Sequence, residues 1–355
     1  MSIIDSLKTI EKYDRSGMLE LIESFPDQCL DAKCIGDEFE PDKGFRKGYK
    51  NIVVIGLGGS AIGADLARSY TADDITIPFF INRNYTLPNF ADEDTLVIAS
   101  SYSGNTEEVL SAYRDARSRG CRIIVITSGG KLEKNAKDDG VGIISIPGSL
   151  PPRAALGYSF FPLLILLSKI GLIKDQSFFI DDAIRVLRIL KEDSIGHKIK
   201  TADNQAKKIA SHIFGRMAFI YGAQDHIDSV VTRWRGQLAE NAKTLSSGNI
   251  FPEMSHNEIV GWENPKTVLA KSVVIMLKDA SDHPRISKRM DVAGNMLKKE
   301  GIGVIEVKSF GKELLARIFS LIYMGDYVSL YLAILNNVDP TPVERINYLK
   351  KELSR

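Results

Sequence analysis

Five apolar runs, separated mostly by helical patterns, constrain the fold of the first half of this chain. Each run is uninterrupted, as is typical of a strand that is buried on both faces of a parallel sheet. The runs are NIVVIGLGGS (51–60), ITIPFFI (75–81), TLVIAS (95–100), RIIVIT (122–127) and VGIISIP (141–147). Strands that alternate with helices in this way indicate a doubly wound α/β domain.

A second series of strand and helix patterns follows a largely helical stretch at 154–195. The expected strands of this series lie at 217–223, 243–250, 272–278 and 303–309. Because 355 residues exceed the usual size of one core, we predict two α/β domains, each with a mostly parallel sheet flanked by helices. The predicted segments are an N-terminal helical segment that packs on the core (1–45), a first domain (46–170), a helical connection (171–200) and a second domain (201–355).

The composition excludes several classes of protein. A hydrophobic fraction of 44% and a charged fraction of 26% are typical of soluble globular proteins. The 46 basic and 45 acidic residues give a net charge of +1, whereas nucleic-acid binding normally needs a clear basic excess. No apolar run is expected to reach the length of a membrane span, because the longest candidate, Phe160–Leu167, is too short and contains Pro162.

The N-terminal residues and the cysteines favour a cytoplasmic protein. The sequence MSIIDSLKTIEKYD carries acidic residues early and lacks the apolar core of a secretory signal. Three cysteines, Cys29, Cys34 and Cys121, are too few for a disulfide framework. Neither a second cysteine pair nor a partner histidine lies near CLDAKC, so we expect ordinary reduced thiols rather than a metal site.

Two loops rich in glycine and hydroxyl groups follow the first and third apolar runs. They are GLGGSAIG (56–63) and the loop within SSYSGNTEE (100–108). Glycine lets a backbone turn sharply and approach a ligand closely, and serine or threonine can donate a hydrogen bond to an anion. The candidate ligand-binding residues of these loops are Gly58, Gly59, Ser60, Ser101, Ser103 and Thr106.

The position of the two loops predicts that they form a phosphate cradle. Ligands of open α/β sheets bind at the carboxyl ends of the strands, where the strand order reverses. Charged hydrogen bonds contribute about 1.5–3 kcal/mol each, so three or four could anchor a phosphate monoester without lysine. For Ser60 or Thr106 alone, helix capping is the better explanation. Because one helix needs only one cap, the whole cluster favours the cradle.

A dinucleotide site is an alternative interpretation of GLGGSA. Its fingerprint expects an acidic residue about 20 residues later, at the end of the second strand. Here Asn82 and Arg83 follow that strand. Arg83 could accept the phosphate of NADP, so an NADP-dependent reductase stays open, although it leaves SSYSGNT unexplained.

Together, the two loops resemble the sugar isomerase (SIS) domain, which binds phosphosugars. Three further segments resemble the bifunctional phosphoglucose/phosphomannose isomerase family, and the resemblance runs from about residue 50 to the end. These segments are LPPRAALGYSFFPLL (150–164), ENAKTLSSGNIFPEMSHNEIVGW (240–262) and NNVDPTPVERINYLK (336–350). The family implies reversible conversion of glucose 6-phosphate and mannose 6-phosphate to fructose 6-phosphate through an enediol, without a metal or another cofactor.

The resemblance also implies roles for residues outside the cradle. Glu240 in ENAK matches the family's glutamate base, and Glu258 is a second candidate carboxylate. His256 in SHNE matches the histidine that opens the sugar ring. In related enzymes this histidine reaches the neighbouring subunit's site, which implies a homodimer with shared active sites. Without the resemblance, Glu240 would be interpreted as a solvated helical residue and His256 as a structural loop residue.

Three more site residues follow from the same resemblance. Arg153 in PPRAALG matches the arginine that stabilises the enediolate, although an arginine in such a loop is often an ordinary surface residue. The family's C-terminal lysine matches Lys350, with Lys351 as the alternative. Thr341 in DPTPV is a candidate for tolerance of both epimers.

Two other functions remain possible at this point. A phosphosugar-binding regulatory protein would use the same two loops without turnover, but no helix-turn-helix or basic patch accompanies them here. An amidotransferase-linked isomerase would normally carry a glutaminase domain, for which no room is expected before residue 50.

Overall fold

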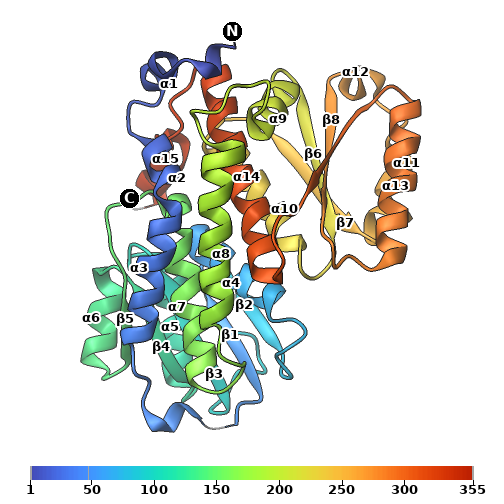
Figure 1. The fold of residues 1–355 in the computed structure, drawn as a ribbon. Coiled ribbons are helices and arrows are strands. Elements are labelled where there is room, and N and C mark those ends of the chain that lie inside the picture. Colours follow the sequence, from blue (N-terminus) through green and yellow to red (C-terminus); the bar gives the residue numbers. More distant parts are fainter. Residues whose placement is uncertain (1, 47, 354–355) are drawn as a thin grey trace. The chain divides into compact units, whose positions relative to one another are not determined.

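The computed structural model describes residues 2–46 and 48–353, which divide into two compact units (Figure 1). The five-stranded unit contains Ser24–Arg185 and Glu313–Ala316. The four-stranded unit contains Met1–Glu23, Val186–Lys312 and Arg317–Arg355. Each unit is therefore built from segments that are far apart in the sequence.

The sheet of the five-stranded unit is parallel, as predicted, with the strand order β2-β1-β3-β4-β5. Its strands are β1 (Asn51–Ile55), β2 (Phe79–Asn82), β3 (Thr95–Ser101), β4 (Arg122–Thr127) and β5 (Gly142–Ser145). All residues of β1 and β3 are buried, which explains their uninterrupted apolar sequences. The edge strand β2 begins four residues later than predicted, after Pro78, which has no N–H to donate.

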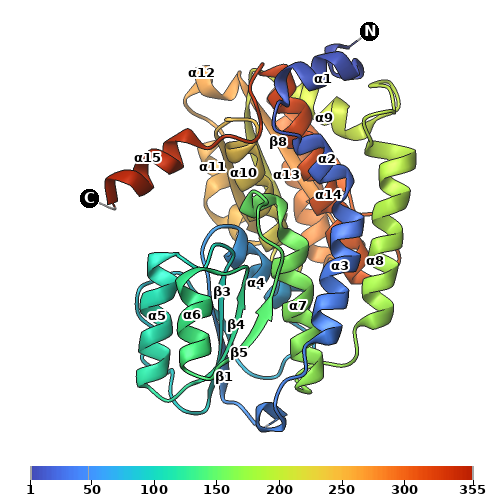
Figure 2. The same ribbon diagram turned by 90° about the vertical axis from the view of Figure 1, so that its left-hand side faces the viewer.

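Helices cover both faces of this sheet (Figure 2). On one face, α5 and α6 pack their apolar residues against alternate residues of β1, β3 and β4. On the other face, α4 packs against α7, and α7 packs against α3. The helices of this region are α3 (Phe25–Glu38), α4 (Gly59–Tyr70), α5 (Glu107–Ser118), α6 (Gly130–Asp138), α7 (Leu156–Lys169) and α8 (Ser177–Leu190).

The second sheet is also parallel, with the strand order β7-β6-β8-β9. Its strands are β6 (Met217–Ala223), β7 (Ser246–Phe251), β8 (Ser272–Lys278) and β9 (Gly303–Lys308). Two helices lie on opposite sides of the sheet, α10 (Asp228–Glu240) and α13 (Pro284–Lys299) (Figure 1). The core beneath α13 contains Val274 and Met276 of β8. The prediction of two parallel α/β domains is confirmed.

The long helix α14 (Leu314–Leu335) corrects one expectation. The sequence predicts that no apolar run reaches the length of a membrane span, with Phe160–Leu167 as the longest candidate. The helix is nevertheless long and apolar enough to cross a membrane. Its whole apolar window is buried in the protein, and the core helix of a globular protein passes the same test.

The helical N-terminal stretch is divided rather than continuous. Ser6 caps α1 (Leu7–Tyr13) by accepting a hydrogen bond from the N–H of Thr9, and Gly17 has a φ of +75° before α2 (Met18–Glu23). The remaining α-helices are α9 (Gln205–Ile213), α11 (Glu258–Gly261), α12 (Lys266–Leu269) and α15 (Glu344–Leu353). Short turns of 3₁₀ helix lie at Ile3–Asp5, Lys43–Arg46, Pro152–Ala154 and Glu253–His256, and a π-helical turn lies at Lys191–Ile195.

Candidate active site

The two glycine- and hydroxyl-rich loops meet at the carboxyl ends of β1 and β3. These neighbouring strands mark the point where the strand order reverses, since β2 lies on one side of them and β4 on the other. Ser60, in the first turn of α4, accepts a hydrogen bond from the backbone N–H of Tyr102, with 3.1 Å between Oγ and N. The two loops are therefore joined to each other, as the cradle prediction requires.

The hydroxyl groups of the second loop do not cap the following helix. Thr106 occupies the N-cap position of α5, but its side chain makes no capping hydrogen bond. Instead, its Oγ1 lies 3.0 Å from Oγ of Ser101, which is 1% exposed. Ser103 is exposed, and its Oγ accepts a hydrogen bond from the N–H of Asn105 over 3.3 Å. Helix capping therefore does not explain this cluster.

Close backbone contacts explain two of the glycines. A Cβ on Gly104 would lie 1.7 Å from the carbonyl oxygen of Gly129, and Gly104 has a φ of +63°. A Cβ on Gly59 would lie 2.5 Å from the carbonyl oxygen of Pro152. Gly58, the N-cap of α4, has a φ of +53° and open space around it. Gly59 thus allows the Pro152 turn to lie directly against the start of α4.

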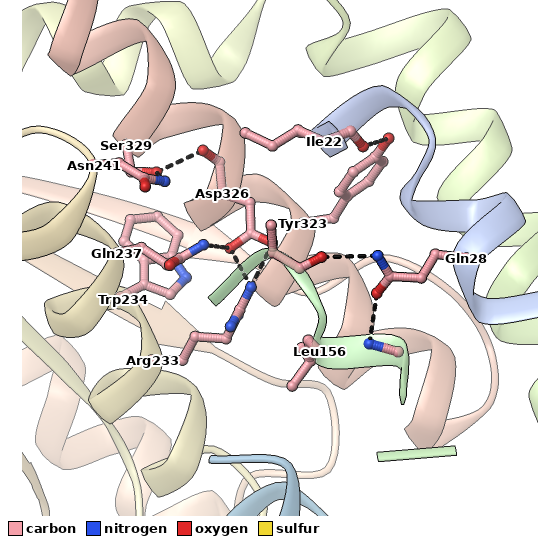
Figure 3. A network of polar contacts seen from close by, with 12 residues as sticks. Ile22, Gln28, Leu156, Arg233, Trp234, Gln237, Asn241, Tyr323, Asp326 and Ser329 are labelled. Carbon is pink, nitrogen blue, oxygen red and sulfur yellow. Dashed lines mark hydrogen bonds and ion pairs between the residues drawn. The ribbon is translucent and has the colours of Figure 1, made fainter. Parts of the chain in front are cut away.

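That turn carries Arg153, which is buried and only 4% exposed, unlike an ordinary surface arginine. The hydroxyl of Tyr102 accepts the N–H of Leu150 over 3.0 Å, and burial raises the pKa of Tyr102. Gln28 of α3 donates to the carbonyl of Ala154 over 2.8 Å and accepts the N–H of Gly157 over 2.9 Å (Figure 3). These contacts hold the Arg153 turn from both sides.

Tyr102 and Gln28 were not singled out in the sequence. Tyr102 lies inside the loop within SSYSGNTEE (100–108), but no residue near it in the sequence predicts that its hydroxyl reaches Leu150, 48 residues away. Gln28 lies 126 residues before the carbonyl that it binds. Neither contact leaves a local signal in the sequence.

Two observations concern the side chains that a nucleotide cofactor or a metal would use. The guanidinium of Arg83 is paired with the carboxylate of Asp65, so it is already engaged within the protein. Within residues 2–46 and 48–353, histidine, cysteine, aspartate and glutamate form no group of three or more that could hold a metal ion.

In the four-stranded unit, Glu240 is the last residue of α10 and lines a cavity of about 660 Å³. Its side chain is half-buried, unlike that of a fully solvated helical residue. The other lining residues are Ala239, Lys243, Thr244, Leu245, Val338, Asp339, Pro342, Val343, Glu344, Arg345 and Ile346. Glu240 therefore faces a space of the size that small ligands occupy.

Lys243 connects this turn to the loop that contains Thr341. Its Nζ donates to the carbonyl of Glu240 over 2.6 Å and to the carbonyl of Pro340 over 3.1 Å. Lys243 has a φ of +55°, a conformation that costs energy for any residue with a Cβ. The N–H of Thr341 is fixed by the carboxylate of Asp339 over 3.0 Å. Lys243 stands in the ENAK motif, but it was not among the predicted site residues.

His256 and Glu258 lie close in sequence but in different surroundings. His256 ends a 3₁₀ turn and is exposed, and its ring makes no hydrogen bond within the described part of the chain. Both carboxylate oxygens of Glu258 are occupied, by the hydroxyl of Tyr221 over 2.5 Å and by Nδ2 of Asn249 over 2.7 Å. Burial and the nearby Glu258 raise the pKa of Tyr221. Glu258 thus anchors its turn, and Glu240 is the better candidate base.

The C-terminal lysines are not brought to the cavity. Lys350 and Lys351 lie on α15, none of whose residues is buried. The first turn of this helix contributes Glu344, Arg345 and Ile346 to the cavity that Glu240 lines. Lys350 lies six residues beyond Glu344, about 9 Å along a helix. The four-stranded unit alone therefore does not place either lysine beside Glu240.

Comparison with known proteins gives two family matches. The SIS domain matches residues 47–146, and the bacterial phospho-glucose isomerase C-terminal SIS domain matches residues 202–353. Among solved structures, a hypothetical protein from Thermus thermophilus shares the fold, with a TM-score of 0.74 at 14% identity over 98% of this chain and 92% of that one.

Two curated relatives are similar over nearly their whole length. A bifunctional phosphoglucose/phosphomannose isomerase from Caldicellulosiruptor bescii is 45% identical over 95% of this chain and 99% of its own. A protein of the same name from Aquifex aeolicus is 36% identical over 86% of this chain and 91% of its own. This chain therefore belongs to the bifunctional phosphoglucose/phosphomannose isomerase family.

Proposed function

We propose that this protein interconverts glucose 6-phosphate and mannose 6-phosphate with fructose 6-phosphate. The observation that carries the proposal is the 45% identity, over almost both full chains, to a relative named for these two activities. The joined hydroxyl-bearing loops and the half-buried Glu240 support it chemically.

The loops at β1 and β3 would bind the 6-phosphate. In the hydrogen bonds described above, Ser60 and Ser103 use their oxygens as acceptors of backbone N–H groups. Each hydroxyl thus keeps its own proton to donate to a phosphate oxygen. The start of α5 adds a favourable helix dipole. A dianion can be held in this way by neutral donors.

Glu240 would transfer the proton between carbons. It takes the proton from C2 of the open-chain aldose, and the electrons of that C–H bond form the C1=C2 bond of an enediolate. The electrons of the C1=O π bond move to O1 as the enediolate forms. Glu240 then returns the proton to C1, and O1 gains the proton that O2 loses, which gives the ketose with no net loss or gain of electrons. Arg153 would stabilise the negative charge on the enediolate oxygens, which a buried cation does well.

His256 would open the sugar ring, for which an imidazole suits both directions of proton transfer. Its exposed position fits a residue that acts on a substrate outside its own turn. We propose that it serves the site of a second copy, in a homodimer with shared active sites. Lys350 would approach the same substrate, and Thr341 would help to accept both epimers.

The decisive assay incubates the purified protein with glucose 6-phosphate or mannose 6-phosphate, in the presence of EDTA, and measures fructose 6-phosphate. Both substrates should be converted. In heavy water, deuterium should enter at C2 of the recovered aldose, as an enediol mechanism requires. A regulatory protein would bind the sugars without converting them, and a reductase would instead bind and oxidise NADPH.

Replacement of the base tests its role directly. Glu240→Gln keeps the shape of the side chain but cannot accept a proton, so kcat should fall at least about 100-fold, the usual contribution of a general base. Binding of glucose 6-phosphate, measured by calorimetry, should change little. Glu263→Gln, at an exposed glutamate, is the control and should keep full activity. A decrease of less than tenfold in Glu240→Gln would remove Glu240 from this role.

A further inference from the structure

The helix that ends at Glu240 carries a row of buried polar residues. Arg233, Gln237 and Asn241 are spaced four residues apart, so they lie on one side of α10 and the residue after it. Their exposures are 5%, 4% and 0%. This side faces α14, because all three side chains bind residues of that helix.

Asp326 is the centre of these contacts (Figure 3). Nη2 of Arg233 lies 3.0 Å and 2.8 Å from the two carboxylate oxygens of Asp326, and Nε2 of Gln237 donates to one of them over 2.7 Å. One turn further along α14, Oγ of Ser329 accepts Nδ2 of Asn241 over 2.9 Å and donates to the carbonyl of Asp326 over 2.7 Å. The network ends beside Glu240.

Stability alone is a poor explanation for this network. A buried ion pair must be desolvated, and well-packed apolar residues of similar volume often stabilise a fold equally well or better. What a directional network provides is a defined arrangement of the two helices, because its hydrogen bonds form only over a narrow range of distances and angles. Trp234 adds to this, since its Nε1 donates to the carbonyl of Leu321 over 2.8 Å. A Cβ on Gly325 would lie 2.4 Å from that same nitrogen, so the helices are in close contact here.

We propose that Asp326 is a positioning residue for proton transfer, acting through α10 to fix the direction of the Glu240 carboxylate. The inference rests on the proposed function, in which Glu240 must lie within hydrogen-bond reach of a carbon-bound proton. Displacement of a catalytic group by even 1 Å can cost about 100-fold in rate. Asn241 directly follows Glu240, so its bond to Ser329 fixes the end of the helix where the base lies.

The test separates positioning from stability with an apolar replacement of the ion pair. Arg233→Met/Asp326→Leu removes both charges and should recover most of the melting temperature that Asp326→Asn loses, because only the amide of Gln237 then lacks its carboxylate acceptor. If Asp326 positions the base, kcat of the double variant should still be at least tenfold below that of the parent protein. KM should stay within about threefold, because the cradle residues are untouched.

A matched control lies on the same helix. Tyr323→Phe removes a buried hydroxyl of α14 that donates to the carbonyl of Ile22 over 2.9 Å rather than to α10. It should keep kcat within twofold. All rates are measured at least 15 °C below the melting temperature of each variant, so that unfolding does not contribute to any decrease in kcat.

Two outcomes would overturn the inference. The first is a stable Arg233→Met/Asp326→Leu protein with the kcat of the parent. The second applies if that variant does not fold, and it uses Ser329→Ala, which removes the hydrogen bond between Asn241 and Ser329. This variant should lower kcat at least threefold with KM unchanged, and full activity would refute positioning. If the parent protein converts no hexose 6-phosphate at all, the proposed function fails instead, so the two failures are distinguishable.

Discussion

At the scale of single residues, the cradle depends on which partner each hydroxyl already has. Ser60 and Ser103 accept backbone N–H groups, so binding an anion costs neither of them an existing bond. The pair formed by Ser101 and Thr106 differs, because one hydroxyl must donate to the other. Only one of the two protons is therefore available while that bond lasts. Thr106 is half-buried and Ser101 almost fully buried, so Thr106 is the better placed donor.

This asymmetry predicts different effects for two substitutions. Thr106→Val keeps the shape of the side chain but removes a charged hydrogen bond worth about 1.5–3 kcal/mol, so KM for glucose 6-phosphate should rise at least about tenfold. Ser101→Ala leaves Thr106 free to rotate and should raise KM less. Steady-state kinetics of both variants decide this. Ser118→Ala, at the exposed end of the same helix, is the control, and an unchanged KM in Thr106→Val would make the hydroxyl pair purely structural.

The meeting of the two hydroxyl-bearing loops could be predicted from the sequence, whereas the contacts that support them could not. A cluster of hydroxyls after a buried strand is a local pattern, and Ser60, Ser101, Ser103 and Thr106 all lie in the two joined loops. Burial of Arg153 depends on partners far away in the chain, among them Gln28. The motif resemblance led to Glu240 but gave no indication that the partner of Arg233 on the same helix is Asp326, 93 residues later.

At the scale of elements, strands were predicted best where both faces are buried. The bounds expected for β4, β6 and β8 are those observed, because an apolar run of six or seven residues has the length of a strand rather than of a helix. The prediction of β7 began three residues early, at Lys243. Lys243 belongs instead to the turn after α10, which its left-handed backbone and its two carbonyl contacts define. Such tertiary contacts override local β propensity.

The loop after β3 gives a prediction at this scale. Gly104→Ala adds a Cβ that would overlap the carbonyl of Gly129, so the loop between β3 and α5 must move away from the start of α6. We expect the free energy of unfolding to fall by at least about 2 kcal/mol. The left-handed conformation alone costs a residue with a Cβ about 1–2 kcal/mol, and the overlap with Gly129 adds to that cost. Gly140→Ala is the matched control, since Gly140 has a φ of +66° and open space around it. Equal losses in urea unfolding would show that the Gly129 contact is unimportant.

At the scale of the whole molecule, the four-stranded unit is assembled from both ends of the chain. Its N-terminal segment is attached by Asp5, whose carboxylate accepts the N–H and hydroxyl of Thr201 over 2.8 Å and 2.9 Å. Asp5 also lies 3.1 Å from Nζ of Lys207, with side-chain exposures of 8% and 0%. The sequence predicted helices at 1–45 but gave no sign of this attachment, because Asp5 and Lys207 are 202 residues apart.

This attachment predicts how stability depends on pH. Burial opposes ionisation of Asp5, but its hydrogen bonds with Thr201 and Lys207 outweigh that effect and lower its pKa below the ordinary value. A depressed carboxyl pKa stabilises the fold at every pH above the unfolded value of about 3.9, and this contribution is lost as the pH falls through the folded pKa. Burial lowers the pKa of Lys207, and its hydrogen bond with the Asp5 carboxylate opposes that effect.

Asp5→Asn should therefore be less stable than the parent protein at pH 7, by about 3 kcal/mol, since it leaves a buried lysine without its carboxylate. The difference between the two proteins should stay constant from pH 8 to pH 5 and shrink progressively below pH 4. Urea unfolding at each pH measures it, with Glu11→Gln as the control at an exposed carboxylate of α1. A difference that stays the same at pH 3 and pH 7 would mean that the Asp5 carboxylate does not hold the N-terminal segment through its charge.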